Sequence, residues 1–576
     1  MKAIRPSCFS YIVHCSVVLF LGISPARAQA ALDLLQQHKQ IEERQHQHGR
    51  ELKEHYRKRQ APSGAKLDLA RPDPVDQESE RCLKVRDVKI TGMTIFHKSR
   101  FTKDIQSALG SCVAINTVNK MLRVITNSYI TAGYITSRAF VQPQDMKDDV
   151  LEVLVIEGKQ SGFKIDGPRL KKRTLAMTFP KNKDGKLNIR NLEQGIDQLN
   201  RMRSYNTKLD IIPGKDLGQS IVSISNKSDL DLAYGSITVN NDGQAATGRL
   251  LYTASVNVDS PLRLGDFWSF YVSGSFGESS TNSNLSYGGY FSLPYGYWTI
   301  SIYGGVSRYD SLIKGAVLSF ESKGRSWNIG GEIGRLLFRN DRSKLSLAFH
   351  ARVNNNDSII NDINLLSGTY RLVRVGAELR YQYLWKRGLL ALSSRVDRGI
   401  SSLGSREADL GPYGPHLGYW RLSQTASWTM PFVLEGKAMQ LNILANGQWA
   451  FQPVYSPERF FIGSRGTVRG FSSGGIGGDR GGMIRAEVST NVYKLGRLVS
   501  RLKGHVIKAY AGYDIGAIVT RSRNPFERGS LQAIAAGIKI IGPWVTLDCL
   551  IARGVKSPWF IPKHETQACL MARLIL

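Results

Sequence analysis

Segments of about ten residues with strictly alternating apolar and polar side chains recur from about residue 231 to the C-terminus. In residues 252–259 and 373–383, one face of the expected strand is apolar and the other is polar or charged. A soluble sandwich also alternates, but its strands are usually shorter. Strand length and the aromatic residues at segment ends, such as Tyr295, Trp385 and Trp544, favour a transmembrane β-barrel. We count about 16 antiparallel strands, an even number as barrel closure expects.

The final expected strand, residues 567–576, follows the same alternation, so the chain is expected to end in the membrane. Alternation also places Cys549 on the apolar face and Cys569 on the lumen face. Opposite faces argue against a disulfide between these two cysteines, and the sequence leaves their pairing undecided.

Residues 1–30 have the pattern of a secretory signal peptide, with Lys2 and Arg5 before an apolar run and small residues around Ala28. The run is shorter than the roughly 20 residues of a spanning helix, which disfavours a membrane anchor. A secreted chain meets oxidising conditions. We therefore expect a disulfide between Cys82 and Cys112.

Residues 31–60 are rich in polar residues and contain no proline, which predicts a helix with no apolar stripe for docking into a core. Its length of roughly 40 Å suits a plug inside a water-filled pore. Residues 61–80 concentrate Pro, Gly, Asp and Ser, and we interpret them as a flexible linker.

Two compact α+β units are predicted between this linker and the barrel, at residues 81–158 and 159–228. In the first, helices are expected at residues 101–109 and 116–132 and strands at 137–141 and 150–156. The second repeats this plan with a helix at residues 192–202. The barrel is expected to span residues 229–576.

The formal charge of +30 ordinarily suggests an anionic partner. Here the basic residues are scattered along strands and loops without interleaved stacking aromatics, which favours a cationic lumen and contact with anionic lipid over nucleic-acid binding. Neither a Gly-x-Ser-x-Gly elbow nor a His-Glu-x-x-His motif is present. We expect a protein that is not an enzyme and that uses no metal or cofactor.

A glycine-rich stretch at about residues 453–482 is too long for an ordinary hairpin. It contains the motif Val468, Arg469, Gly470 and Phe471. A second motif follows on an expected barrel strand, with Gly512, Asp514 and Gly516. Alternation along residues 507–516 turns Asp514 into the lumen.

With these motifs the chain resembles the two-partner secretion outer-membrane transporters, the TpsB family that exports haemolysins, filamentous haemagglutinins and contact-dependent inhibition toxins. Residues 133–145 with 151–158 resemble the first POTRA domain of that family, and residues 192–199 with 209–214 resemble the second. The resemblance implies that the stretch at 453–482 is a loop inserted into the lumen. It also implies that Arg469 meets Asp514 there.

The resemblance further implies an outer membrane location in a Gram-negative bacterium, with the POTRA domains in the periplasm and a large secreted exoprotein as partner. Outer-membrane lipid, lipopolysaccharide and the assembly machinery are the other expected partners of a monomer. Export is expected to need no ATP, and the unfolded partner is expected to add a strand to the first POTRA domain. The predicted contact residues are Leu122, Ile125, Tyr129, Gly133, Tyr134, Ser137 and Phe140.

Two other functions share parts of this plan. An assembly factor that inserts other barrels uses more POTRA units, and a diffusion porin with a periplasmic extension has no plug helix. The two units and the plug-like helix therefore favour export.

Overall fold

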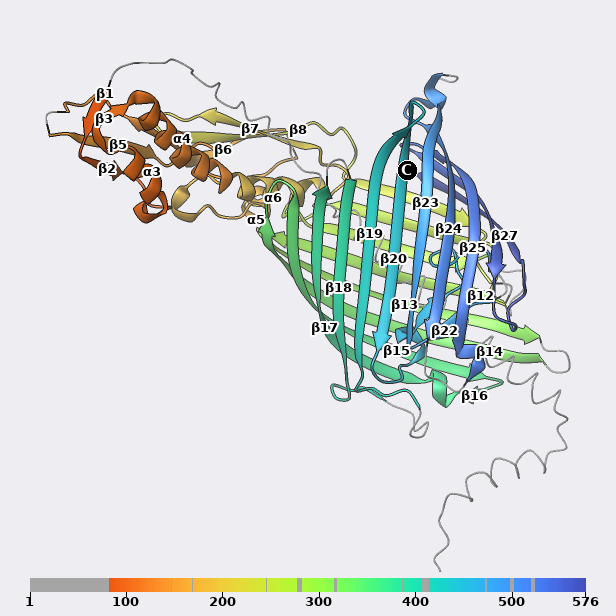
Figure 1. Cartoon of the computed structure of the whole chain (residues 1–576). Helices are drawn as coiled ribbons and strands as arrows, with labels where there is room; N and C mark the ends of the chain where they lie inside the picture. The colour runs from red at the N-terminus through yellow and green to blue at the C-terminus, as the bar shows by residue number, and fades with distance from the viewer. Residues whose placement is uncertain are drawn as a thin grey trace, which may run out of the picture.

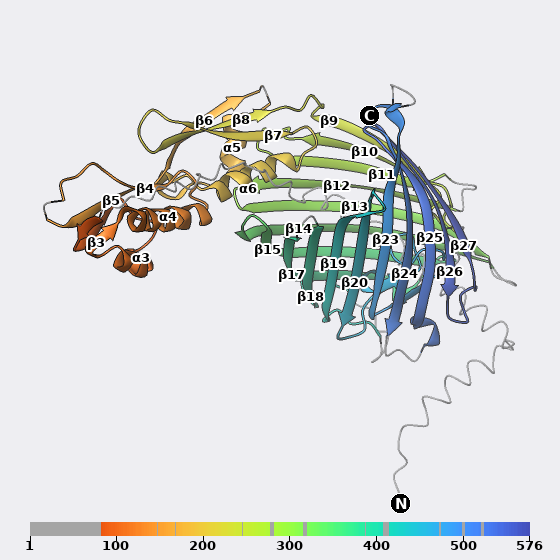
Figure 2. The ribbon, with the colours of Figure 1, turned by 45° about the horizontal axis from the view of Figure 1, so that its top comes forward.

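The computed structural model describes residues 82–576 apart from 147, 168, 245, 277–281, 315–318, 386–387, 407–413, 472–473, 498–501 and 520–523. The predicted signal peptide (1–30), N-terminal helix (31–60) and linker (61–80) lie outside the described residues. Two α+β units project from one end of a large barrel (Figures 1 and 2). Among the described helices, none is long and apolar enough to cross a membrane.

The first unit packs two helices on a three-stranded sheet of order β2-β5-β4 beside a two-stranded sheet of β1 and β3. Buried side chains three or four residues apart line one face of α4, and the helix ends in a Schellman motif in which Gly133 adopts φ +97°. The elements are β1 (Cys82–Val85), β2 (Asp87–Thr91), η1 (Lys98–Phe101), α3 (Thr102–Ser107), β3 (Gly110–Ala114), α4 (Ile115–Thr131), β4 (Arg138–Val141) and β5 (Val150–Ile156).

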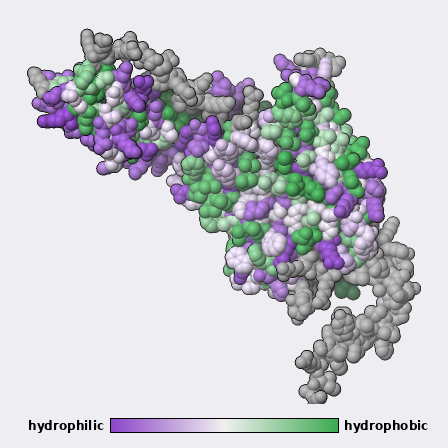
Figure 3. Space-filling model, in the orientation of Figure 1, coloured by the Kyte–Doolittle hydropathy of each residue, from purple (hydrophilic) through white to green (hydrophobic). Residues whose placement is uncertain are grey.

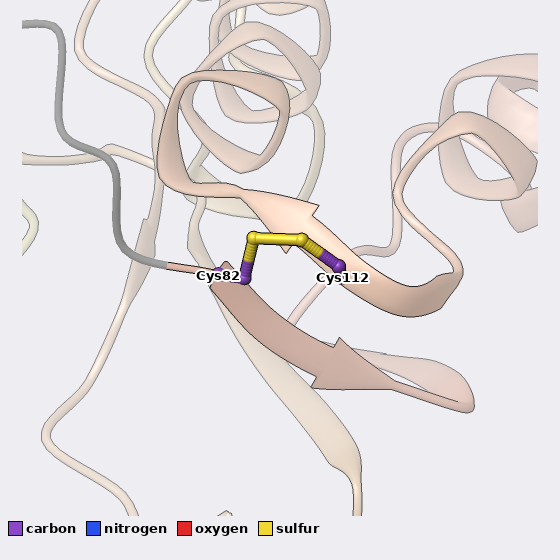
Figure 4. The surroundings of a disulfide bond; sticks show 2 residues. All are labelled: Cys82 and Cys112. Carbon is purple, nitrogen blue, oxygen red and sulfur yellow. A yellow bond between two sulfur atoms is a disulfide. The ribbon is translucent and has the colours of Figure 1, made fainter.

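The disulfide between Cys82 and Cys112 joins β1 to β3 at the start of this unit (Figure 4). The sequence did not predict the β1–β3 sheet, because only one side chain of β3, that of Val113, is buried and the strand has no visible period. Cys549 and Cys569 are both free. Cys569 is buried while Cys549 is exposed, as expected of opposite faces of one wall.

The second unit repeats the arrangement with a three-stranded sheet of order β6-β8-β7. Its helix α6 begins at an Asn188 side chain that accepts a hydrogen bond from the Arg190 amide. The helix α5 was not predicted, because seven residues are too few to show a helical stripe. The elements are β6 (Lys159–Asp166), α5 (Lys172–Thr178), η2 (Lys183–Gly185), α6 (Ile189–Asn200), β7 (Thr207–Pro213) and β8 (Gln219–Asn226).

The junction between the two units is closely packed. Ile135 of the first unit belongs to the apolar core of the second. The buried carboxylate of Glu157 accepts hydrogen bonds from the Thr94 and Ile95 amides and from the Tyr129 hydroxyl, and it pairs with Lys186 of the second unit at 2.8 Å. The two units therefore form a continuous rod.

The barrel closes by pairing β27 with β9. Its described part holds sixteen antiparallel strands and the two-residue β16, which extends the β15 hairpin. The strands are β9 (Ala233–Asn240), β10 (Leu251–Asp259), β11 (Phe267–Ser275), β12 (Ser283–Tyr295), β13 (Trp298–Lys314), β14 (Ser319–Arg339), β15 (Ser343–Ile360), β16 (Ile363–Asn364), β17 (Tyr370–Trp385), β18 (Gly388–Ile400), β19 (Trp420–Leu434), β20 (Lys437–Ala450), β23 (Arg480–Lys494), β24 (Val506–Val519), β25 (Arg528–Ile541), β26 (Val545–Lys556) and β27 (Thr566–Ile575).

The outer surface of the barrel is apolar and its inner surface is polar. Along β24, Tyr513 and Ile515 are exposed, whereas Asp514 between them is fully buried. Apolar side chains gather over the barrel strands in Figure 3, and hydrophilic ones over the α+β units. This is the surface that a lipid bilayer requires. The predicted transmembrane β-barrel is confirmed.

Helix α6 docks the second unit on the turns at one rim of the barrel, which we call the docking rim. Arg201 donates hydrogen bonds to the Gly265 carbonyl and to the Ser292 hydroxyl, each at 2.5 Å. Asp197 pairs with Arg339 at 2.8 Å and with Lys344 at 2.5 Å. These contacts span the turns after β10, β12 and β14, so the second unit has a fixed orientation on the barrel.

Acidification is expected to loosen the junction between the α+β units. Burial by itself raises the pKa of Glu157, but hydrogen bonds from Lys186, Thr94 and Ile95 lower it to about 2. Because this pKa lies below its ordinary value of 4.5, the stabilising effect is complete above that value and is lost as the pH falls toward 2. We expect hydrogen-exchange protection of the amides around Gly133 to fall over this window in the detergent-purified chain.

Glu157→Gln is expected to show the lower protection already at about pH 6, since the amide cannot pair with Lys186 as an ion. Glu152→Gln is the matched control, because Glu152 and its partner Lys89 are mostly exposed. Equal protection in Glu157→Gln and the unaltered chain would contradict a stabilising role for this pair.

Candidate functional site

The stretch between β20 and β23 folds back into the barrel. Its strands β21 (Phe460–Ile462) and β22 (Ile476–Gly478) pair with each other. Apolar side chains of this stretch pack against inward-facing residues of β24 and β25 and form one buried cluster with them. The cluster contains Ile462, Val468, Phe471 and Ile476 from the stretch and Ile518, Leu531 and Ala533 from the wall. The stretch is therefore a loop inside the lumen, here called the lumenal loop.

Arg469 at the tip of the lumenal loop binds Asp514 on β24 through both carboxylate oxygens. Its Nε and Nη2 atoms donate to Asp514 Oδ2 and Oδ1, each at 2.7 Å. The Arg469 backbone amide donates to the same carboxylate at 3.0 Å. Charge-assisted bidentate bonds of this kind are the strongest hydrogen bonds that side chains form.

Two further charges complete a neutral four-residue cluster, which we call the latch. Arg469 Nη1 donates to Glu487 at 2.9 Å, and Arg485 Nε donates to Asp514 at 3.1 Å. Both residues lie on β23, where Arg485 and Glu487 are the cross-strand partners of Asp514 and Gly512. Neither residue was predicted, although alternation along residues 480–494 places both on the lumen face.

The glycines of both motifs make room for the latch. A Cβ atom on Gly512 would lie 2.9 Å from Arg469 Nη2, and one on Gly516 would lie 2.8 Å from Val468 Cγ2. Gly470 adopts φ +84°, and a Cβ there would lie 3.0 Å from the Arg553 and Gly554 backbone. The Phe471 ring occupies the space above Gly554. A Cβ atom added to Gly554 would lie 2.7 Å from this ring. The glycines thus allow the loop to lie directly on the wall.

A second buried charge cluster anchors the first arm of the lumenal loop. The fully buried Glu458 carboxylate pairs with Arg374 on β17 and with Arg421 on β19. Arg421 also pairs with Asp397 on β18 at 2.6 Å, and His350 on β15 lies 2.7 Å from Asp397. We call these five residues the arm cluster. No sequence motif predicted it, because its members come from strands and a loop far apart in the chain.

Further arginines tie the loop to other parts of the wall. Arg465 pairs with Asp242 at 2.8 Å and with Asp548 at 2.6 Å. Arg459 pairs with Glu527 at 3.0 Å. A cavity of about 240 Å³ lies beside Arg465, Arg469 and Arg485. The loop is thus held by ion pairs as well as by apolar packing.

The residues predicted to contact a substrate fall into two groups. Ile125 lies in the core of the first unit, and Tyr129, Gly133 and Ser137 brace its junction with the second. Their burial corrects the prediction that they line a binding groove, because buried atoms cannot touch a passing chain. The remaining three, Leu122, Tyr134 and Phe140, are partly accessible.

Comparison with known proteins agrees with this architecture. Residues 218–540 match the haemolysin secretion/activation protein family ShlB/FhaC/HecB, residues 83–158 match the ShlB-type POTRA domain, and residues 152–213 match a POTRA domain. The outer membrane transporter CdiB of Escherichia coli is 28% identical over 499 residues, which cover 84% of this chain and 81% of that protein. The hemolysin transporter protein ShlB of Serratia marcescens is 27% identical, with 86% of each chain covered.

Solved structures are similar over nearly the whole length. CdiB from Escherichia coli superposes with a TM-score of 0.85 at 25% identity, covering 94% of this chain and 99% of that one. CdiB from Acinetobacter baumannii shares the fold, with a TM-score of 0.78 at 20% identity, covering 93% and 99%. Since the family match spans more than half of the 576 residues, the chain belongs to the ShlB/FhaC/HecB haemolysin secretion/activation family of outer-membrane transporters of two-partner secretion.

Proposed function

We propose that this chain exports a large secreted partner protein through its barrel, and that the lumenal loop gates the pore. The observation that carries the proposal is the bidentate bond between Arg469 and Asp514 inside the lumen. An ion pair inside the lumen holds the loop in one place. When the pore opens and fills with water, both ions are hydrated again. Such a bond suits a gate that must be firm at rest and must open for a passing chain.

Export draws on the partner itself in this proposal. No nucleotide-binding motif occurs in the sequence. Folding of the partner outside the cell would make its passage irreversible, because a folded domain cannot return through the pore. The partner must therefore pass as an extended chain.

The edge strand β4 of the first POTRA domain is the proposed point of recognition. The strand lies at the edge of its sheet, next to α4. The Ala139 amide donates to the Thr126 hydroxyl of α4 at 3.1 Å, so it points away from β5. Alternation along a strand then directs the Val141 amide and carbonyl to the same open side. An extended partner can pair with these groups as an added strand.

Side chains beside β4 would supply selectivity. Leu122 on α4, the helix in contact with β4, and Phe140 on β4 itself are partly accessible. Tyr134 follows the end of α4 and lies in edge-on contact with Tyr129, with ring centroids 6.4 Å apart. We assign partner contact to these three residues and a bracing role to the four buried ones.

Removing one partner of the latch is expected to abolish secretion while the barrel still inserts. Asp514→Asn leaves Arg469 and Arg485 without their shared carboxylate, and an uncompensated buried charge costs about 3–5 kcal/mol. Arg469→Gln leaves Asp514 with Arg485 alone. The measurement is the amount of partner in the medium, together with heat-modifiable migration of the barrel as the readout of folding.

Arg406→Gln is the matched control for the latch variants. Arg406 pairs with Asp357 at 2.9 Å, but both side chains are about half exposed, so this pair contributes little. Normal secretion by both latch variants would refute the gating role. Loss of heat-modifiable migration would show instead that the latch is needed for barrel assembly.

The edge-strand mechanism predicts that Val141→Pro reduces secretion strongly. Proline removes the outward amide of residue 141 but no bond to β5, and edge strands tolerate proline. Extended backbone at Phe140 is also compatible with a following proline. Crosslinking between the first POTRA domain and the partner should fall in parallel, with the circular dichroism of the purified chain unchanged.

Val141→Ala separates the backbone from the side chain at this position. It keeps the amide and shortens only a partly buried side chain. We expect near-normal secretion from Val141→Ala. Equal secretion from the proline and alanine variants would rule out pairing at this edge.

A further inference from the structure

An apolar groove of about 720 Å³ crosses the outer surface of the barrel over β13, β14, β15, β17, β18 and β19. This volume falls in the range of small-molecule sites. Its walls are outward-facing side chains, each about half exposed, including Ile302, Ile333, Phe349 and Val396. A hollow of this size on a lipid-facing wall must be filled by hydrocarbon.

Small residues create the floor of the groove. Gly331, Ala351 and Ala377 line it on three neighbouring strands. A Cβ atom on Gly331 would meet only the Ser301 carbonyl oxygen, at 3.8 Å, so the space above this glycine is open. The groove is thus part of the wall itself and does not depend on a mobile loop.

One end of the groove carries a positive charge. Arg398 lies over the Trp420 ring, 4.8 Å from its centroid, and both residues line the groove. Arg398 lies two residues before the end of β18, and Trp420 begins β19. These strand ends are at the rim opposite the docking rim. Since the POTRA domains are periplasmic, this is the extracellular rim, level with the outer leaflet.

We propose that this groove binds one molecule of a phosphorylated glycolipid of the outer leaflet, lipid A, with an acyl chain in the groove and a phosphate on Arg398. The shape and the charge match an amphiphile whose anionic head lies at the extracellular rim. A guanidinium binds phosphate through paired hydrogen bonds, and its position over Trp420 holds it at the interface. A lipid with a neutral head would leave Arg398 without an anion.

The test measures lipid retention by the full chain purified in detergent. Native mass spectrometry with added lipid A, and separately with phosphatidylglycerol, gives the number of molecules bound. We expect the unaltered chain to retain one lipid A in preference to phosphatidylglycerol, because a phosphate monoester carries more negative charge than a phosphodiester. Arg398→Gln removes the cation and is expected to lower lipid A retention about tenfold, as for the loss of one charge-assisted bond. Gly331→Leu fills the floor and is expected to lower retention to a similar extent, because the acyl chain loses its contact with the wall.

Matched variants control for general effects on the wall. Arg335→Gln removes an arginine that lies 4.9 Å from the centroid of the Trp298 ring, next to the other end of the groove and at the docking rim, so this variant tests at which end the phosphate binds. Gly447→Leu enlarges another open glycine of the outer wall, whose Cβ would meet only the Gly481 carbonyl oxygen at 3.8 Å. Both are expected to retain lipid A as the unaltered chain does.

Two results would overturn the proposal. Undiminished lipid A retention by Arg398→Gln and Gly331→Leu would show that the groove holds only exchangeable bilayer lipid. Equal retention of lipid A and phosphatidylglycerol by the unaltered chain would show that the site does not select a glycolipid. Heat-modifiable migration of every variant verifies that the barrels compared are folded.

Discussion

Backbone hydrogen bonding in a bilayer is the constraint on which this structure depends. A strand edge exposed to lipid leaves amide and carbonyl groups without water, so the sheet has to close. The closing contact between β27 and β9 is short, with five residue pairs against seventeen between β13 and β14. Leu576 and Gly235 exchange two further backbone bonds at the end of this seam. Because the ring is closed, alternate side chains face a confined lumen, and charges there must find partners across it.

The position of the lumenal loop is set by the pairing of charges inside this confined lumen. Asp514 and Glu458 are fully buried, and each is matched by two arginines. Every inward residue has outward neighbours, so the wall that carries His350 and Asp397 on its inner face carries Phe349 and Val396 on its outer face. Each of these strands thus contributes charged side chains to the lumen and apolar side chains to the lipid surface, because successive side chains point to opposite faces of a strand.

The features that could be predicted from the sequence are local ones. Alternation gave the barrel and turned Asp514 inward, since the pleat fixes which side chains share a face. The same reasoning, applied to residues 480–494, would have found Arg485 and Glu487. Glu458 was not predictable, because Arg374 lies 84 residues away and no periodicity encodes which strands meet across a lumen. Burial of Tyr129 and Ser137 was equally hidden, because it depends on how two domains pack.

The contacts along the chain also set what the proposed gate must break in order to open. Apolar side chains join the two POTRA domains, and Arg201, Asp197 and their partners tie the second domain to the docking rim. This path fixes the orientation of β4 relative to the barrel. The lumenal loop is held by ion pairs and by an apolar cluster that includes Val468 and Phe471. Water that enters an open lumen can solvate the separated ions, but it does not compensate for exposed apolar side chains. Water that enters the lumen therefore lowers the cost of breaking the ion pairs of the loop, and the apolar cluster sets the remaining cost of displacing it.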